Sequence, residues 1–206
     1  VTVVRWRYHP FTVSSLSSQL LESRKLYWGT FPFHWGISAI LVGHLAALLV
    51  PSAFILWNGA PARLYLLEGT GLALGLWAAV GLTVLIWRRL SEPRIRRVTT
   101  RGDLAVLATV AVQVVTGLWI ALAHRWGSYW GPAVLTPYLW SLFTFSPDTT
   151  GIAVLPVVVK VHVLAFYVFL ALFPFTRLVH IITLPLQYLF RPWQLVVANR
   201  SMLDQR

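Results

Sequence analysis

The stretch of sequence that decides the fold runs from Phe33 to Trp57 and reads FHWGISAILVGHLAALLVPSAFILW. It lies within a longer run, 26–62, that contains no Asp, Glu, Lys or Arg. About 20 apolar residues in a helix cross the hydrocarbon core of a membrane, which is about 30 Å thick. The stretch therefore predicts a transmembrane helix over 31–57, whose two histidines, His34 and His44, lie at membrane depth.

Three further apolar runs predict that the chain crosses the membrane four times. They occupy 66–88, 103–124 and 154–184, and the last contains Pro174, which is expected to kink its helix. Of the 206 residues, 57% are hydrophobic and only 11% are charged, whereas about a quarter of the residues of a soluble domain are charged. We therefore expect one all-α membrane domain over 1–206, a bundle of four transmembrane helices.

The charged residues indicate which way the helices run. The chain has 17 Lys and Arg against 6 Asp and Glu, and all the cations but Arg63, Arg125 and Lys160 fall on one side of the predicted spans. Cytoplasmic loops retain Lys and Arg, so both ends, including the tail 189–206, are expected in the cytoplasm. The positive charge thus reports topology and lipid contact, and no nucleic-acid partner is expected. The Trp-rich and Tyr-rich loop 125–150 is expected to lie at the opposite membrane interface.

Histidine is the residue type that carries chemistry in this chain. There is no cysteine, which excludes disulfides, thiolate-bound iron–sulfur clusters and covalently attached c-type haem within the chain. An ionisable side chain at membrane depth is costly unless it faces a partner or a cofactor. The candidate metal ligands are therefore His34 and His44 in the first span and His162 and His180 in the fourth.

The opposite directions of the first and fourth spans pair these histidines by depth. His34 and His180 are the inner two, and His44 and His162 the outer two, which suits two b-type haems, each bound by one histidine from either helix. Along ideal helices the first pair is separated by about 15 Å and the second, five full turns apart on one face, by about 27 Å. We therefore expect the fourth helix to bend at Pro174, the helices to be inclined, or the irons to lie off the level of some ligand Cα atoms. Interhelical hydrogen bonding and a proton relay are the alternatives that the residues leave open.

Three sequence motifs resemble the gamma subunit of respiratory nitrate reductase, a membrane dihaem cytochrome b. They are FHWGISAILVGH at 33–44, SEPRIRRVTTRGD at 91–103 and HVLAFYVFLALFPFTRLVH at 162–180. The resemblance covers nearly the whole chain. Members of that family have a further apolar helix upstream of the segment that matches 5–24, and we expect this fifth, N-terminal helix to be missing here.

The resemblance implies a function and a role for each histidine pair. His44 and His162 would bind the outer haem, distal to the catalytic subunits, and His34 and His180 the inner, proximal haem. The chain would oxidise quinol at the outer side of a bacterial or archaeal cytoplasmic (inner) membrane and pass electrons inward through the outer and then the inner haem. The acceptors would be an iron–sulfur beta subunit and a molybdenum-containing alpha subunit, which reduces nitrate.

Three further site residues are expected, Arg177 and Arg63 from the same resemblance and Gly43 from its position. Arg177 matches a family arginine in the last motif and is expected to pair with a haem propionate. Gly43, beside His44, would let a quinol or a haem edge approach closely. Arg63 would replace the basic residue that the family uses for quinol at the outer start of the second span.

Two other functions share some of these features. A dihaem quinone-reactive anchor of another complex, of the heterodisulfide-reductase or sulfite-reductase type, would use the same histidines. A haem-free membrane transporter or anchor would use the histidines for packing or proton transfer. A visible absorption spectrum separates the second alternative, and the proteins that co-purify separate the first.

Overall fold

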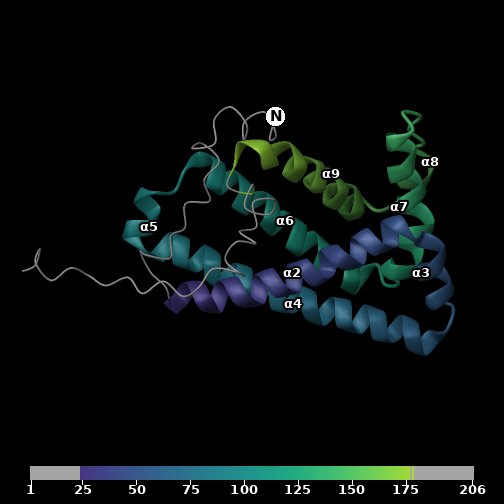
Figure 1. The fold of residues 1–206 in the computed structure, drawn as a ribbon, viewed down its shortest axis with the longest axis horizontal. Helices are drawn as coiled ribbons and strands as arrows, with labels where there is room; N and C mark the ends of the chain where they lie inside the picture. Colours follow the sequence, from purple (N-terminus) through teal and green to yellow (C-terminus); the bar gives the residue numbers. More distant parts are fainter. Residues whose placement is uncertain (1–23, 177, 179–206) are drawn as a thin grey trace, which may run out of the picture.

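The computed structural model describes residues 24–176 and 178, and Figure 1 shows them as a set of helices joined by short connections. Four helical stretches are long and apolar enough to cross a membrane: Leu26–Leu49, Pro61–Ser91, Arg101–Ala123 and Val157–Phe175. The predicted class, an all-α protein with four membrane spans, is confirmed. In chain order the described elements are α2 (Arg24–Leu49), α3 (Pro51–Trp57), α4 (Pro61–Ser91), α5 (Pro93–Arg97), α6 (Arg101–Ala123), α7 (Gly127–Phe143), α8 (Thr150–Ala153), α9 (Val157–Leu172) and the 3-10 turn η2 (Phe173–Phe175).

The spanning helices expose large apolar side chains along their lengths. Trp28 on α2 and Trp87 on α4 are each 66% exposed. A soluble protein rarely leaves contiguous apolar surface of this kind in water. These faces suit contact with lipid, as the composition of the chain predicts.

The first predicted span, 31–57, is wrong at its outer end because the helix stops earlier. α2 ends at Leu49, and Val50 takes a non-helical conformation with φ of −132° before the short helix α3 starts at Pro51. A proline disfavours helical geometry in the residue before it and has no N–H to continue the hydrogen bonds. Pro51 therefore divides the apolar run into a membrane span and a short capping helix.

α2 and α4 form an antiparallel pair whose helices touch through small residues. A Cβ atom added to Gly36 would lie 2.7 Å from the carbonyl oxygen of Leu74 and 3.0 Å from the Cβ of Ala78, which is only 1% exposed. Small residues let two membrane helices approach to backbone contact. α4 also packs on α6, and α6 packs on α9, so that the pairs α2–α4 and α6–α9 are joined through α4 and α6 (Figure 1).

At the end where α2 finishes and α4 starts, which is the expected outer end, α7 runs across the bundle (Figure 1). Thr136 Oγ1 donates a hydrogen bond to the carbonyl of Ala47 at 3.3 Å, and Trp140 Nε1 donates to the carbonyl of Leu48 at 3.0 Å. The last carbonyls of a helix have no partner within it. Residues from the predicted interfacial loop 125–150 therefore complete the end of α2.

The fourth span also departs from the continuous helix predicted over 154–184. α9 begins only after Pro156 and ends at Leu172, where the 3-10 turn η2 contains Pro174. The α-helix stops ten residues after His162, and His180, which was expected to share a face with it, lies outside the described residues. At Pro174, where a bend is expected, the backbone has 3-10 instead of α-helical geometry.

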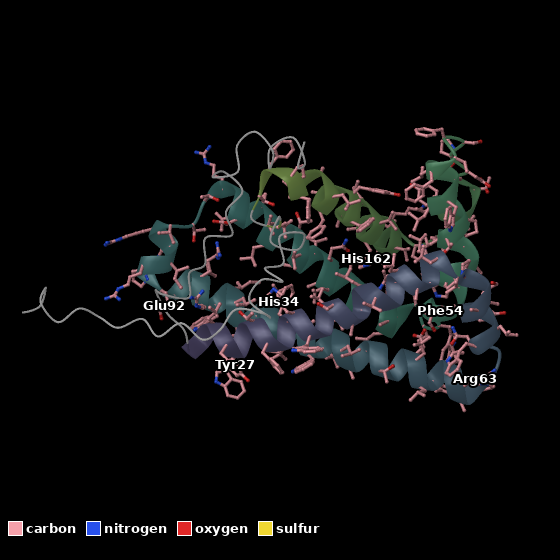
Figure 2. The ribbon with its side chains drawn as sticks, viewed as in Figure 1. Tyr27, His34, Phe54, Arg63, Glu92 and His162 are labelled. Atoms are coloured by element: carbon pink, nitrogen blue, oxygen red, sulfur yellow. The ribbon has the colours of Figure 1, made fainter. Side chains whose placement is uncertain are left out.

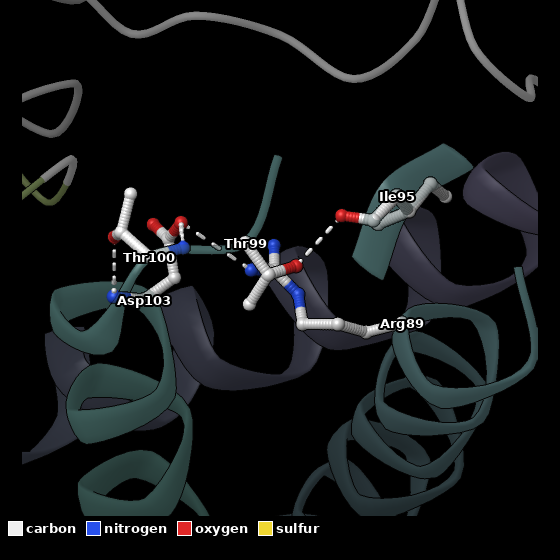
Figure 3. Close-up of polar contacts among 5 residues, drawn as sticks. All are labelled: Arg89, Ile95, Thr99, Thr100 and Asp103. Carbon is white, nitrogen blue, oxygen red and sulfur yellow. Dashed lines mark hydrogen bonds and ion pairs between the residues drawn. The ribbon is translucent and has the colours of Figure 1, made fainter. Parts of the chain in front are cut away.

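The connection at the other end, between α4 and α6, is short and ordered by polar contacts (Figure 3). Thr100 and Asp103 form a capping box at the start of α6, with N–H···O distances of 3.2 Å and 3.0 Å. Arg89 on α4 lies 3.6 Å from the same Asp103 carboxylate. Ile95 of α5 is 1% exposed, so α5 packs against the bundle while its arginines 94, 96 and 97 are exposed.

Candidate functional site

The rings of His44 and His162 lie close together, although their helices are not neighbours in the chain. His44 lies on α2 and His162 on α9, and their ring centroids are 6.5 Å apart with planes inclined by 33°. The main packing partner of α2 is α4 and that of α9 is α6, whereas α2 and α9 pack little against each other over the described residues. The structure thus brings together His44 and His162, the two histidines that were predicted to lie at the same outer depth.

Each histidine of α2 is oriented by a carbonyl one turn earlier in its own helix. Nδ1 of His34 lies 2.9 Å from the carbonyl oxygen of Thr30, and Nδ1 of His44 lies 2.8 Å from that of Ile40. A carbonyl oxygen only accepts, so in both rings Nδ1 carries the proton and donates. In a neutral imidazole Nε2 then has the lone pair, which is the arrangement that a histidine ligand of a metal needs.

The ring of His162 is held from α6. Its Nδ1 lies 2.8 Å from Thr116 Oγ1, and a Cβ atom added to Gly117 would lie 3.2 Å from its Cε1. The Gln113 amide oxygen accepts from the backbone N–H of Phe166 at 2.8 Å, and its amide nitrogen donates to the carbonyl oxygen of His162 at 3.2 Å and to Nδ1 of the ring at 2.9 Å. Both outer histidines are therefore engaged at Nδ1, and their Nε2 atoms make no hydrogen bond to the part of the chain that the structure describes.

The arrangement fits a metal that needs only two protein ligands. Among residues 24–176 and 178 there is no group of three or more His, Asp or Glu placed to bind a metal ion. A haem iron takes four ligands from its macrocycle and one or two axial ligands from the protein. With a metal–nitrogen bond of about 2 Å on each side, imidazoles on opposite sides of one iron have centroids about 6 Å apart. The observed 6.5 Å between His44 and His162 is close to this value.

The other candidate residues lie at different places. Gly43 has open space beside it, because an added Cβ atom would meet nothing within 4 Å. Arg63 lies at the tip formed by α3 and the start of α4 (Figure 2), where its Nε donates to the carbonyl of Trp57 at 2.8 Å and its guanidinium lies 5.3 Å from the Trp57 ring. It therefore caps the end of α3. Arg177 and His180 fall outside the described residues.

Sequence reasoning missed the contribution of α6. Gln113, Thr116 and Gly117 stand at i, i+3 and i+4 within an apolar span, and this spacing puts them on one helix face. Polar side chains at membrane depth face other helices more often than lipid. That signal was present in the sequence, but which histidine the three residues serve follows only from the contact between α6 and α9.

Known proteins of one family match this chain over nearly its whole length. A family model described as "Nitrate reductase gamma subunit" matches residues 1–199. The nitrate reductase gamma chain of Bacillus subtilis is 31% identical over 204 residues, which cover 97% of this chain and 90% of the relative. The respiratory nitrate reductase 1 gamma chain of Escherichia coli is also 31% identical over 204 residues, covering 95% and 88%. A nitrate reductase-like protein NarX of Mycobacterium tuberculosis is 32% identical over 208 residues, and these are 98% of this chain but 32% of that protein.

Proposed function

Because the chain belongs to the nitrate reductase gamma subunit family, we propose that it is the quinol-oxidising dihaem cytochrome b subunit of a respiratory nitrate reductase. The observation that carries the proposal is the pair of imidazoles of His44 and His162, 6.5 Å apart on two different helices. Protein groups contact Nδ1 of both rings, and the Nε2 atoms make no hydrogen bond to the described residues. A packing role alone would not need this orientation in both rings.

The protein contributes axial ligands and their placement. His44 and His162 would hold the outer haem, and His34 together with His180 the inner one. Bound haem supplies a one-electron couple at each level, which links a two-electron quinol to one-electron carriers in partner subunits. Iron–sulfur beta and molybdenum-containing alpha subunits would receive the electrons at the cytoplasmic face and reduce nitrate there.

In the proposed function, charge movement across the membrane stores part of the energy of quinol oxidation. Quinol oxidation at the outer side releases its protons outside, while the electrons leave toward the cytoplasm. Moving one elementary charge against a membrane potential of 100 mV stores about 2.3 kcal/mol. The long helices therefore act as an insulating scaffold that keeps electron exit and proton release on opposite sides.

Two residues at the outer level are assigned to quinol. Gly43 borders open space directly beside His44, so a flat quinol ring has room to approach that ligand. Arg63, which now caps α3 and contacts Trp57, supplies a cation at the same end of the bundle. At the inner level Arg177 would pair with a propionate of the inner haem.

The face that carries α5 is assigned to the partner subunits. Arg94, Arg96 and Arg97 are exposed on this short helix, whereas Ile95 anchors it in the bundle. A rigid, positively charged surface suits an acidic protein surface. Positive charge at this end also follows from membrane topology alone, so co-purification with the partners is the measurement that bears on it.

The proposed function is tested by purifying the chain in mild detergent and recording its absorption spectrum before and after adding quinol. We expect reduced b-type bands, two haems per chain and a pigment that acid acetone extracts, because no cysteine is present to attach it. His124→Ala is the matched control, since His124 ends α6 away from the paired rings. A purified wild-type chain without haem bands refutes the proposal.

A further inference from the structure

We propose that α6 is the element that tunes the outer haem, because Thr116 and Gly117 fix the ring of His162 through its Nδ1 edge. The inference rests on the proposed function, since it takes His162 as an axial ligand. It goes beyond that function by assigning positioning residues on a helix that contributes no ligand. The contacts of Thr116 and Gly117 with the ring carry it, and Gln113 joins α6 to the backbone of α9 beside them.

Thr116 is the acceptor for the Nδ1 proton of His162. Its hydroxyl donates to the carbonyl of Val112 at 2.6 Å, which commits the only hydroxyl proton to α6 itself. A lone pair of Thr116 Oγ1 is then directed at His162 Nδ1, 2.8 Å away. This hydrogen bond holds the proton on Nδ1 and therefore presents the lone pair of Nε2 to the iron.

Gly117 has no side chain, which leaves room for the ring of His162 against α6. A Cβ atom at this position would lie 3.2 Å from His162 Cε1 and 3.8 Å from Nδ1, and the first distance is shorter than an ordinary van der Waals contact. The edge of the imidazole thus lies directly against the backbone of α6. Any larger residue would turn the ring or push it toward α2.

Gln113 ties the two helices together beside this contact. Its amide accepts from the N–H of Phe166 and donates to the carbonyl of His162, at 2.8 Å and 3.2 Å. In that orientation the amide nitrogen also lies 2.9 Å from Nδ1. A donation from this amide nitrogen to Nδ1 needs the lone pair on Nδ1. When His162 binds iron through Nε2, Nδ1 must carry the proton instead, and Thr116 Oγ1, 2.8 Å away, is then its acceptor.

The two axial ligands of the outer haem are therefore held differently. His44 donates to the carbonyl of Ile40 on its own helix, a contact that no side-chain substitution removes. His162 donates to a side chain on another helix, so its hydrogen bond depends on how α6 and α9 pack. A hydrogen bond from Nδ1 makes the imidazole a stronger electron donor, which stabilises oxidised iron and lowers the potential of the haem.

The test is a potentiometric titration of the two haems in the purified holoprotein, followed by visible absorption. Thr116→Val should raise the midpoint potential of the outer haem alone, and Thr116→Ser should restore it. For a one-electron couple each 59 mV of shift is a tenfold change in the ratio of reduced to oxidised haem. Thr109→Val is the matched control, because within residues 24–176 and 178 Thr109 hydrogen-bonds only to the carbonyl of Ala105 on the same helix, at 2.8 Å.

A second pair of variants tests the steric contact. Gly117→Ala should change the low-spin ferric electron paramagnetic resonance signal of the outer haem, because the ring angle must change. Gly71→Ala should leave that signal alone, since an added Cβ atom there meets nothing within 4 Å.

The outcomes separate this inference from the proposed function. Wild-type potentials in Thr116→Val, or equal shifts in Thr116→Val and Thr109→Val, overturn the inference and leave the proposed function standing. If Thr116→Val loses the outer haem, Thr116→Ser decides: retention at the wild-type potential supports the inference, and loss overturns it. A wild-type chain without haem overturns the proposed function and the inference with it.

Discussion

Removing the outer histidines singly and together should show that they serve one metal. The rings of His44 and His162 are 6.5 Å apart, too close for each to hold a separate haem. His44→Ala and His162→Ala should therefore each lower the haem content from two per chain to one. The double variant should also retain one, because both substitutions remove the same haem.

The matched comparison uses two histidines of the same helix. His34 and His44 are ten residues apart on α2, which is about 15 Å of helical rise, so we expect them to bind different haems. The double variant of His34 and His44 should lose both haems, whereas the double variant of His44 and His162 should lose one. Both carry two substitutions, so a general loss of stability does not explain a difference.

The measurement is haem in the acid-acetone extract divided by chain quantified in the same membranes, with His124→Ala as the single-histidine control. A double variant of His44 and His162 that is present at wild-type level but contains no haem would refute the pairing. Retention of one haem after removal of both His34 and His44 would refute it independently. Either result would mean that the contact between α2 and α9 does not define a haem site.

Three further predictions concern electron order and the scaffold. His44→Ala should prevent quinol from reducing the remaining haem. His34→Ala should leave an outer haem that quinol reduces but nitrate cannot reoxidise. The reverse pattern in stopped-flow absorption would place the quinol site at the inner side. Thr100→Ala removes the capping box of α6 and should lower the free energy of unfolding by about 1 kcal/mol, as measured by denaturant titration in detergent, with no change expected in the haem spectrum. Gly36→Ala puts a Cβ atom 2.7 Å from the carbonyl oxygen of Leu74 and should cost about 1–3 kcal/mol as overpacking; a melting temperature equal to that of wild type would contradict the close approach of α2 and α4.

The sequence alone determined the features that depend on composition and charge. A chain with 57% hydrophobic and 11% charged residues cannot remain in water as a compact domain, and apolar runs of about 20 residues have the length of a membrane core. The four histidines stood out for the same reason, because an ionisable group in an apolar run needs a partner. The family followed from local motifs that carry the histidine spacings.

Only the tertiary structure decided which side chains meet. The ends of α2 at Leu49 and of α9 at Leu172 lie beside Pro51 and Pro174, local signals that the lengths of the apolar runs do not show. The 6.5 Å between His44 and His162 depends on the packing of α2 on α4, of α4 on α6 and of α6 on α9. Thr116 contacts His162 across 46 positions of sequence, and no local pattern specifies a contact between residues so far apart in the chain.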